Sequence, residues 1–253
     1  MVRVAVTGAT GAMGTAVLDT AGRRDGVEAV LCVTRSPSNL DTSTPVVTPE
    51  ELAEALATHN VDVIVDFTVP TASLGFAEAA AEHGVGIVIG TTGYGSSERA
   101  GVQAASGHAP VLLAPNFSRG VQGLLAALAA AIDTLPDYDI EVTETHHNRK
   151  RDAPSGTAET LLETIETARP ATERVHGRSG MQPRTRDEVG VHARRAGTIT
   201  GEHEVLIAGG GEELRLVHRA ESRQVFAEGA IDAAVWLAEK SPGWYRFEDV
   251  LGT

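Results

Sequence analysis

Apolar side chains in the first half of the chain form short, nearly continuous runs separated by helical or polar segments. Such runs predict buried strands, and their alternation with helices is typical of a parallel sheet. The predicted strands cover 2–7, 27–33, 61–67, 85–89 and 111–113. Apolar residues at helical spacing predict helices over 13–21, 50–57, a segment ending at 83, and 119–135. We therefore expect an open α/β domain.

The second half of the chain begins with a different pattern. Residues 140–145 carry branched side chains at alternate positions, 146–152 are all polar, and apolar residues return at helical spacing over 158–168. Three further segments alternate between apolar and polar residues, which predicts antiparallel strands with one buried face. They lie near 188–195, 203–208 and 213–218. Residues 169–187, rich in arginine, glycine and proline, predict a long loop with the composition of a mobile segment, and 226–240 predict a closing helix.

The polar segment before the helix suits an anionic ligand. Its side chains that can carry or donate a proton are His146, His147, Arg149, Lys150 and Arg151. Histidine titrates near neutral pH, so His146 is a candidate proton donor, and Lys150 could hold an anionic group by charge. Ser155 is a good N-cap, which places Gly156 and Thr157 in the first turn of the helix. Backbone N–H groups there bind a carboxylate readily, so we predict a site for a small dicarboxylate.

Two other interpretations fit the same residues. A polar loop followed by a capped helix is an ordinary connection, and the loop chemistry alone favours neither interpretation. His146, His147 and Asp152 could also ligate a metal ion. Neighbouring residues that leave a strand point to opposite faces, so the two histidines would rarely reach one ion, and we expect no metal.

The first predicted strand ends in a glycine-rich turn that leads into a helix. The spacing of Gly8, Gly11 and Gly14 is the looser form of a dinucleotide-binding turn. In such a turn one glycine makes the bend, another admits the pyrophosphate and the last lets the helix approach the strand. The candidate cofactor contacts are Gly8, Ala9, Thr10, Gly11, Ala12 and Met13. A turn of this kind can also simply join two elements, but its position before a helix favours cofactor binding.

The end of the second strand bears on the choice of cofactor. NAD-specific folds usually place an acidic residue there, whereas this chain has Thr34, Arg35 and Ser36. With no carboxylate to repel it, a 2′-phosphate could be held by Arg35, so we predict a preference for NADPH, with NADH also possible. The alternative is that Arg35 is a solvated surface residue.

The stretch 141–158 as a whole resembles the signature of the 4-hydroxy-tetrahydrodipicolinate reductase family, also called dihydrodipicolinate reductases. The family pattern is met at Glu141, Val142, Glu144, His146, Lys150, Asp152 and 154–158. The resemblance implies NAD(P)H-dependent reduction of dehydrated 4-hydroxy-tetrahydrodipicolinate to tetrahydrodipicolinate, in lysine and diaminopimelate biosynthesis.

The resemblance also implies roles for five residues of the stretch. His146 would supply the proton, and Lys150 would hold a carboxylate and assist the proton transfer. His147 would bind the substrate, and Gly156 with Thr157 would donate hydrogen bonds to its other carboxylate.

Other turns resemble the cofactor-facing segments of the family. They are Gly90, Thr91 and Thr92 after one strand, and Ala114, Pro115, Asn116 and Phe117 after the next. The implied fold is a Rossmann-like parallel sheet that binds the dinucleotide, residues 1–117 plus 223–253, with an inserted α+β domain, residues 118–222. By the same resemblance, the inserted domain binds substrate and assembles a homotetramer.

Composition narrows the function further. The chain has 253 residues and a formal net charge of −13, which argues against a nucleic-acid partner, because phosphates require a basic face. No apolar run is long enough to span a bilayer and Cys32 is the only cysteine, so we expect a cytoplasmic protein with no membrane partner. Lys150 and Lys240 are the only lysines, and scarce lysine with acidic excess suggests adaptation to high salt.

Two other functions remain open. The chain could be a dehydrogenase for another small carboxylate such as aspartate, since Rossmann folds host many reductions. It could also be a non-catalytic sensor that binds a dinucleotide and reports redox state. The complete 154–158 motif with His146 and Lys150 argues against both, because a sensor needs no acid beside the nicotinamide.

Overall fold

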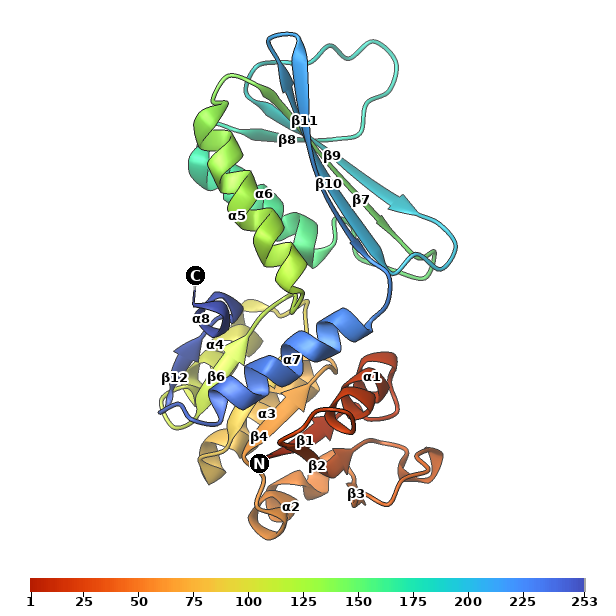
Figure 1. The fold of residues 1–253 in the computed structure, drawn as a ribbon, viewed down its shortest axis with the longest axis vertical. Coiled ribbons are helices and arrows are strands. Elements are labelled where there is room, and N and C mark those ends of the chain that lie inside the picture. Colours follow the sequence, from red (N-terminus) through yellow and green to blue (C-terminus); the bar gives the residue numbers. More distant parts are fainter. Residues whose placement is uncertain (253) are drawn as a thin grey trace. The chain divides into compact units, whose positions relative to one another are not determined.

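The computed structural model describes residues 1–252 and contains two compact units (Figure 1). Unit 1 comprises Met1–Phe117 and Arg223–Thr253, and unit 2 comprises Ser118–Ser222. The chain therefore leaves unit 1, builds all of unit 2 and then returns to unit 1. The fold class predicted from the sequence, a parallel α/β sheet with an inserted α+β unit, is confirmed.

Unit 1 is built on a seven-stranded sheet in which all neighbouring strands are parallel. The strands are β1 (Val2–Thr7), β2 (Val27–Val33), β3 (Val46–Val47), β4 (Val63–Asp66), β5 (Gly86–Ile89), β6 (Pro110–Leu113) and β12 (Gly243–Tyr245). Their order is β12-β6-β5-β4-β1-β2-β3. The strands that follow β1 in the chain (β2 and β3) therefore lie on one side of the β1–β4 pair, and the strands that follow β4 lie on the other. Open α/β sheets bind ligands outside the carboxyl ends of the strands at such a switch point.

Helices cover both faces of this sheet, because successive strand residues point to opposite sides. The helices are α1 (Ala12–Ala21), α2 (Leu52–His59), α3 (Pro70–His83), α4 (Ser96–Ala105), α7 (Gln224–Leu237) and α8 (Phe247–Leu251), with 3₁₀ turns η1 (Pro37–Asn39) and η2 (Pro49–Glu51). Val4 and Val6 belong to a core shared with α1, α7 and α8, whereas Ala5 belongs to a core shared with α2, α3 and α4.

Unit 2 is a five-stranded sheet with two helices on one of its faces (Figure 1). Its elements are α5 (Arg119–Thr134), β7 (Asp139–His146), α6 (Gly156–Ala168), β8 (Glu173–His176), β9 (Glu188–Arg195), β10 (Gly201–Gly209) and β11 (Glu212–Ala220). Ile140 and Val142 of β7 pack against α5 and α6 in a third core. The strand order is β11-β10-β7-β9-β8.

The prediction that the later strands of unit 2 are all antiparallel is wrong for β9. β10 pairs antiparallel with β11 and β7, but β9 pairs parallel with β7 and β8. The chain between β7 and β9 includes the helix α6, and a crossover of this kind returns the next strand in the same direction. Residue alternation reports one buried face but not the direction of the neighbouring strand.

The prediction of a long loop over 169–187 is also wrong in part, because β8 lies within it. Two arginines anchor the remainder: Arg178 contacts Glu188, and Arg184 contacts Glu141. The sequence patterns also did not indicate β3, α4, β12 and α8. β3 and β12 are very short, and α4 buries only Val102 and Ala105. Within residues 1–252, no helix has the length and apolar character needed to cross a membrane.

Candidate active site

The candidate site begins where β7 changes from apolar to polar side chains. Residues two apart in a strand point the same way, so Ile140, Val142, Glu144 and His146 share the face that α5 and α6 cover. The first two belong to the buried core, and the last two follow them at the end of the strand. The strand therefore carries a carboxylate and an imidazole out of the core and toward the start of α6.

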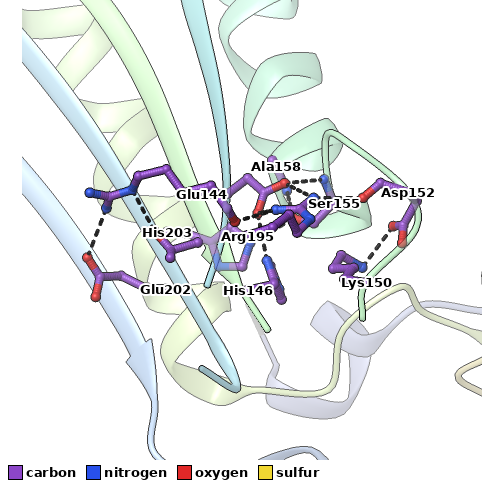
Figure 2. Close-up of polar contacts among 11 residues, drawn as sticks. Glu144, His146, Lys150, Asp152, Ser155, Ala158, Arg195, Glu202 and His203 are labelled. Carbon is purple, nitrogen blue, oxygen red and sulfur yellow. Dashed lines mark hydrogen bonds and ion pairs between the residues drawn. The ribbon is translucent and has the colours of Figure 1, made fainter. Parts of the chain in front are cut away.

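The carboxylate of Glu144 is 1% exposed and accepts hydrogen bonds from three residues (Figure 2). Its Oε2 lies 2.6 Å from Nδ1 of His146 and 2.7 Å from Nη1 of Arg195. Its Oε1 accepts from Nη2 of Arg195 at 2.6 Å and from the backbone N–H of Ser155 at 3.1 Å. Arg195 also donates to the carbonyl oxygen of Asp152 at 2.7 Å. One buried carboxylate thus joins β7, β9 and the start of α6.

These donors decide the charge of Glu144. Burial raises the pKa of its carboxyl, but the hydrogen bonds from His146 and Arg195 outweigh burial and lower the pKa to about 2. An ionised carboxylate can only accept, so Nδ1 of His146 carries a proton and Nε2 is left to exchange one. Gly201 lies beside this nitrogen, and a Cβ there would be 3.1 Å from Nε2.

His203 on β10 forms the buried side of this network. It is 4% exposed, and its ring meets that of His146 edge-on, with the centroids 5.2 Å apart. Its Nε2 lies 2.9 Å from Oγ of Ser155, while its Nδ1 has no hydrogen-bond partner among residues 1–252. Burial and repulsion by His146 lower the pKa of His203 to about 3, so this ring is neutral at physiological pH.

The predicted start of α6 is confirmed. Oγ of Ser155 accepts from the backbone N–H of Ala158 at 3.2 Å, and the helix begins at Gly156. Thr157 is the second residue of the helix and is buried. The first turn of α6 therefore follows directly after Ser155, whose backbone N–H binds Glu144.

Lys150 and Asp152 lie on the loop between β7 and α6 (Figure 2). Nζ of Lys150 lies 2.8 Å from Oδ2 of Asp152, a carboxylate that is 58% exposed. His147 is half-buried, whereas Arg149 and Arg151 are exposed. Among the residues described, no three His, Cys, Asp or Glu side chains come together as metal ligands.

The glycine turn of unit 1 has a geometry that fits a dinucleotide. Gly8 has a φ of +64°, a conformation that favours glycine. A Cβ at Gly14 would overlap the carbonyl oxygen of Gly8 and lie 2.8 Å from Cα of Ala9, so glycine is what lets α1 approach the turn. Gly11, the N-cap of α1, has no side chain, and no acidic residue lies in the first turn. No side chain caps the N–H groups that begin α1, so a pyrophosphate could bind to them.

Asp66 begins the ending Asp66-Phe67-Thr68-Val69-Pro70, which resembles a cofactor-facing loop of the family, and its side chain, which was not predicted as a contact, connects three strand ends. It is fully buried and accepts from the hydroxyls of Thr7 at 2.5 Å, Thr68 at 2.6 Å and Thr91 at 2.7 Å. These threonines lie at or just after the carboxyl ends of β1, β4 and β5. The sequence signal that could have identified it is a single carboxylate that ends the apolar run 63–65.

The other predicted cofactor residues differ in exposure. A Cβ at Gly90 would overlap the ring of Phe67, and Thr92 is exposed. Ala114 and Phe117 are buried, Pro115 is exposed, and Asn116 is half-buried. The Phe117 ring packs edge-on against Phe67 and Phe247, with centroids 5.7 and 5.2 Å away, so its side chain is part of the core.

The residues after β2 lie close to the glycine turn. Oγ1 of Thr34 lies 2.9 Å from Oγ1 of Thr10, and the backbone N–H of Ser36 donates to Oγ1 of Thr34 at 3.3 Å. Arg35 lies between them and is exposed to solvent at the edge of the predicted cofactor site.

Comparisons with known proteins agree over both units. The family model described as "Dihydrodipicolinate reductase, N-terminus" matches residues 2–117, and "Dihydrodipicolinate reductase, C-terminus" matches 120–251. The chain is 52% identical to the 4-hydroxy-tetrahydrodipicolinate reductase of Natronomonas pharaonis, covering 98% of this chain and 99% of that protein. It is 51% identical to the enzyme of the same name from Haloarcula marismortui, covering 99% of each.

A solved structure gives the same result. The dipicolinate-bound dihydrodipicolinate reductase from Paenisporosarcina sp. TG-14 is 26% identical, with a TM-score of 0.79 and 97% of each chain covered. The matches span the parallel sheet, the inserted unit and the stretch from Glu141 to Ala158. The chain therefore belongs to the dihydrodipicolinate reductase family, the 4-hydroxy-tetrahydrodipicolinate reductases of lysine biosynthesis.

Proposed function

We propose that the protein reduces the dehydrated form of 4-hydroxy-tetrahydrodipicolinate to tetrahydrodipicolinate, with His146 as the proton donor. One observation carries the proposal. His146, hydrogen-bonded through Nδ1 to an ionised Glu144, is the last residue of β7, and the loop that follows it leads into the start of α6. A proton donor and an anion-binding helix end are thus contained in one short segment. This arrangement suits a substrate that is held by its carboxylates and must accept a proton on its ring.

The start of α6 and Lys150 would hold the two carboxylates of the substrate. Gly156 and Thr157 would donate backbone N–H groups to one of them, assisted by the helix dipole. Lys150 would bind the other. In the free protein Lys150 is paired with Asp152, which is 58% exposed, and such a pair contributes little free energy. A substrate carboxylate could therefore replace it, and His147 would add a further substrate contact.

His146 would deliver its proton from Nε2. Bound NAD(P)H supplies the hydride, whose addition to the conjugated ring leaves electron density that must be protonated. Histidine is suited to this step near neutral pH. The hydrogen bond to Glu144 keeps a proton on Nδ1 of His146 throughout. Only Nε2 therefore loses a proton and regains it from solvent.

Unit 1 would hold the cofactor. Its proposed contacts are the glycine turn (Gly8, Ala9, Thr10, Gly11, Ala12 and Met13), then Gly90, Thr91 and Thr92, and then Ala114, Pro115, Asn116 and Phe117. The overlap that a Cβ at Gly14 would create supports the close approach of α1 to this turn. Arg35, exposed at the end of β2 where no carboxylate stands, would hold a 2′-phosphate, so NADPH would be preferred over NADH.

The decisive assay follows NADPH absorbance after the protein is added to fresh 4-hydroxy-tetrahydrodipicolinate, made by the preceding synthase from pyruvate and aspartate semialdehyde. Oxidation that depends on the synthase product supports the proposal. Bound NADPH without oxidation would instead favour another small carboxylate or a redox sensor. A parallel assay with NADH tests the cofactor preference, and equal kcat/KM values for the two cofactors would contradict it.

We also propose that the protein is a cytoplasmic homotetramer assembled through the sheet of unit 2. The helices α5 and α6 lie on one face of this sheet (Figure 1). Val217, whose side chain points to the other face, is 43% exposed. Light scattering behind size exclusion tests this, since the mass of a single chain at micromolar concentration would rule the tetramer out.

A further inference from the structure

Glu144 makes more contacts than a core residue needs for packing. It is 1% exposed, and a carboxylate so deeply buried is costly unless it is paired and hydrogen-bonded. Two N–H groups of Arg195 bind its two oxygens at 2.6 and 2.7 Å. This contact neutralises the charge but gives each oxygen only one donor, and His146 and Ser155 take the remaining acceptor sites.

The bond to His146 has a chemical consequence. Because Arg195 already balances the charge of Glu144, the carboxylate does not need an imidazolium beside it. What it does need is a donor, and Nδ1 of His146 can donate only when it carries a proton. The neutral ring is therefore held in one tautomer, with its lone pair on Nε2. Without this bond either tautomer would be available. A neutral ring that carries its proton on Nε2 has no lone pair on that nitrogen, so Nε2 cannot accept a new proton.

The bond to Ser155 extends the same control to the substrate end of the site. Oε1 of Glu144 accepts the backbone N–H of Ser155, whose own hydroxyl caps α6. The proton donor and the start of the anion-binding helix are therefore held by two oxygens of one carboxylate. A shift of Glu144 would displace both at once, and displacements of about 1 Å are sufficient to slow catalysis.

We propose that Glu144 is a positioning residue of the reductase: it holds His146 with the proton on Nδ1 and Nε2 facing the substrate, in register with the start of α6. This inference rests on the proposed role of His146. The groups that contact the His146 ring are Glu144, by a hydrogen bond, and His203 from β10, edge-on. Arg195 from β9 binds Glu144, and the charges of Lys150 from the loop and His218 from β11 act on His203. Of these, Glu144 bonds directly to the ring and fixes its tautomer.

Glu144→Gln tests the role with little change in volume. A glutamine has one accepting oxygen, which Arg195 would occupy, and its NH₂ group can donate to Nδ1 of His146. The neutral imidazole would then carry its proton on Nε2. We expect kcat to fall by about tenfold to a hundredfold, with a smaller change in KM. The proton donor is still present, but its neutral ring carries the proton on Nε2 instead of Nδ1. Glu144→Asp keeps the charge and should recover part of the lost kcat.

The tautomer can be read without any activity. Nitrogen-15 NMR of protein labelled in histidine distinguishes a protonated ring nitrogen from a bare one, and His146→Ala identifies the signals. We expect the neutral ring to be the Nδ1–H form in the wild type and the Nε2–H form in Glu144→Gln. This readout stands whether or not the protein reduces the proposed substrate, so failure of the proposed function is seen separately, as absent wild-type activity.

Glu141→Gln is the matched control. Glu141 also lies on β7, bonds Nε2 of His192 at 2.7 Å and contacts Arg184, but it points to the opposite face of the sheet. We expect it to leave kcat and the His146 tautomer unchanged. The proposal is overturned if Glu144→Gln retains wild-type kcat and the Nδ1–H form. It is also overturned, even if Glu144→Gln fails to fold, if wild-type His146 carries its neutral proton on Nε2.

Discussion

At the residue scale, burial and hydrogen bonding set opposite charge states for neighbouring groups of the candidate site. Glu144 stays ionised, because the donors from His146 and Arg195 outweigh its burial and lower its pKa to about 2. His203 stays neutral, because burial and repulsion by His146 lower its pKa to about 3. Neither group can supply a proton near neutral pH, so we assign the proposed acid chemistry of this cluster to His146.

Removing His146 tests this assignment. We expect His146→Ala to lower kcat by about a hundredfold, the usual contribution of a positioned acid, with NADPH affinity retained. Steady-state kinetics and fluorescence titration of NADPH measure the two effects. His176→Ala, at an exposed position of β8, should behave as the wild type. Near-normal turnover of His146→Ala would exclude His146 from the mechanism.

The buried neutral His203 should make the fold sensitive to acid. Its pKa falls from 6.5 to about 3 on folding, so between these values the unfolded chain binds a proton that the native state does not. Stability contributed by His203 is therefore complete above pH 6.5 and is lost as the pH falls toward 3. In thermal melts between pH 6.5 and 4.5, His203→Asn should lose less melting temperature than the wild type. Equal slopes for the two proteins would refute the prediction.

At the element scale, close approach of backbone to backbone positions α1 at the proposed cofactor site. α1 begins so near the turn after β1 that a Cβ at Gly14 would lie 2.8 Å from Cα of Ala9. Asp66 then ties the ends of β1 and β5 to β4 through Thr7 and Thr91. These contacts hold the loops at the carboxyl edge of the sheet before any ligand binds.

Adding one methyl group at Gly14 should therefore separate α1 from the turn. We expect Gly14→Ala to destabilise the fold by roughly 1–3 kcal/mol, the usual cost of overpacking, and to weaken NADPH binding. Gly75→Ala is the control, since Gly75 lies in α3 with nothing within 4 Å of its built Cβ. That change should be neutral or stabilise by up to about 1 kcal/mol, because alanine favours helix. Urea unfolding measures both, and a neutral Gly14→Ala would contradict the packing argument.

At the scale of the whole molecule, the charge composition is far from balance. Acidic residues number 34 and basic residues 21, of which only Lys150 and Lys240 are lysines. Many arginines are engaged in ion pairs, such as Arg174 with Glu159 and Arg195 with Glu144. A net charge of −13 remains, and its self-repulsion opposes the compact state at low salt.

Salt should relieve this repulsion. The Debye length falls from about 10 Å at 0.1 M to about 3 Å at 1 M, so added salt screens charges across the surface. We expect the melting temperature to rise by roughly 2–4 °C or more between about 0.1 M and 1 M potassium chloride, with activity retained. Scanning calorimetry and the NADPH assay check this. A steady decline of both with salt would rule out adaptation to high salt.

The features that depend on neighbours along the chain could be predicted from the amino-acid sequence. The strand and helix alternation of unit 1, the glycine turn and the cap at Ser155 follow from periodicity, backbone freedom and capping, which act over a few residues. The stretch 141–158 is contiguous, so the resemblance of its residues was also readable. These features were predictable because each is local.

Only the tertiary structure decided which distant residues meet. Arg195 reaches Glu144 across 51 positions because β9 pairs parallel with β7, and His203 reaches Ser155 across 48 positions because β10 lies on the other side of β7. Residue alternation is the same for parallel and antiparallel strands, so it carried no information on this order. Strand order is settled when the apolar faces are buried together, and the partners of His146 are fixed at that step.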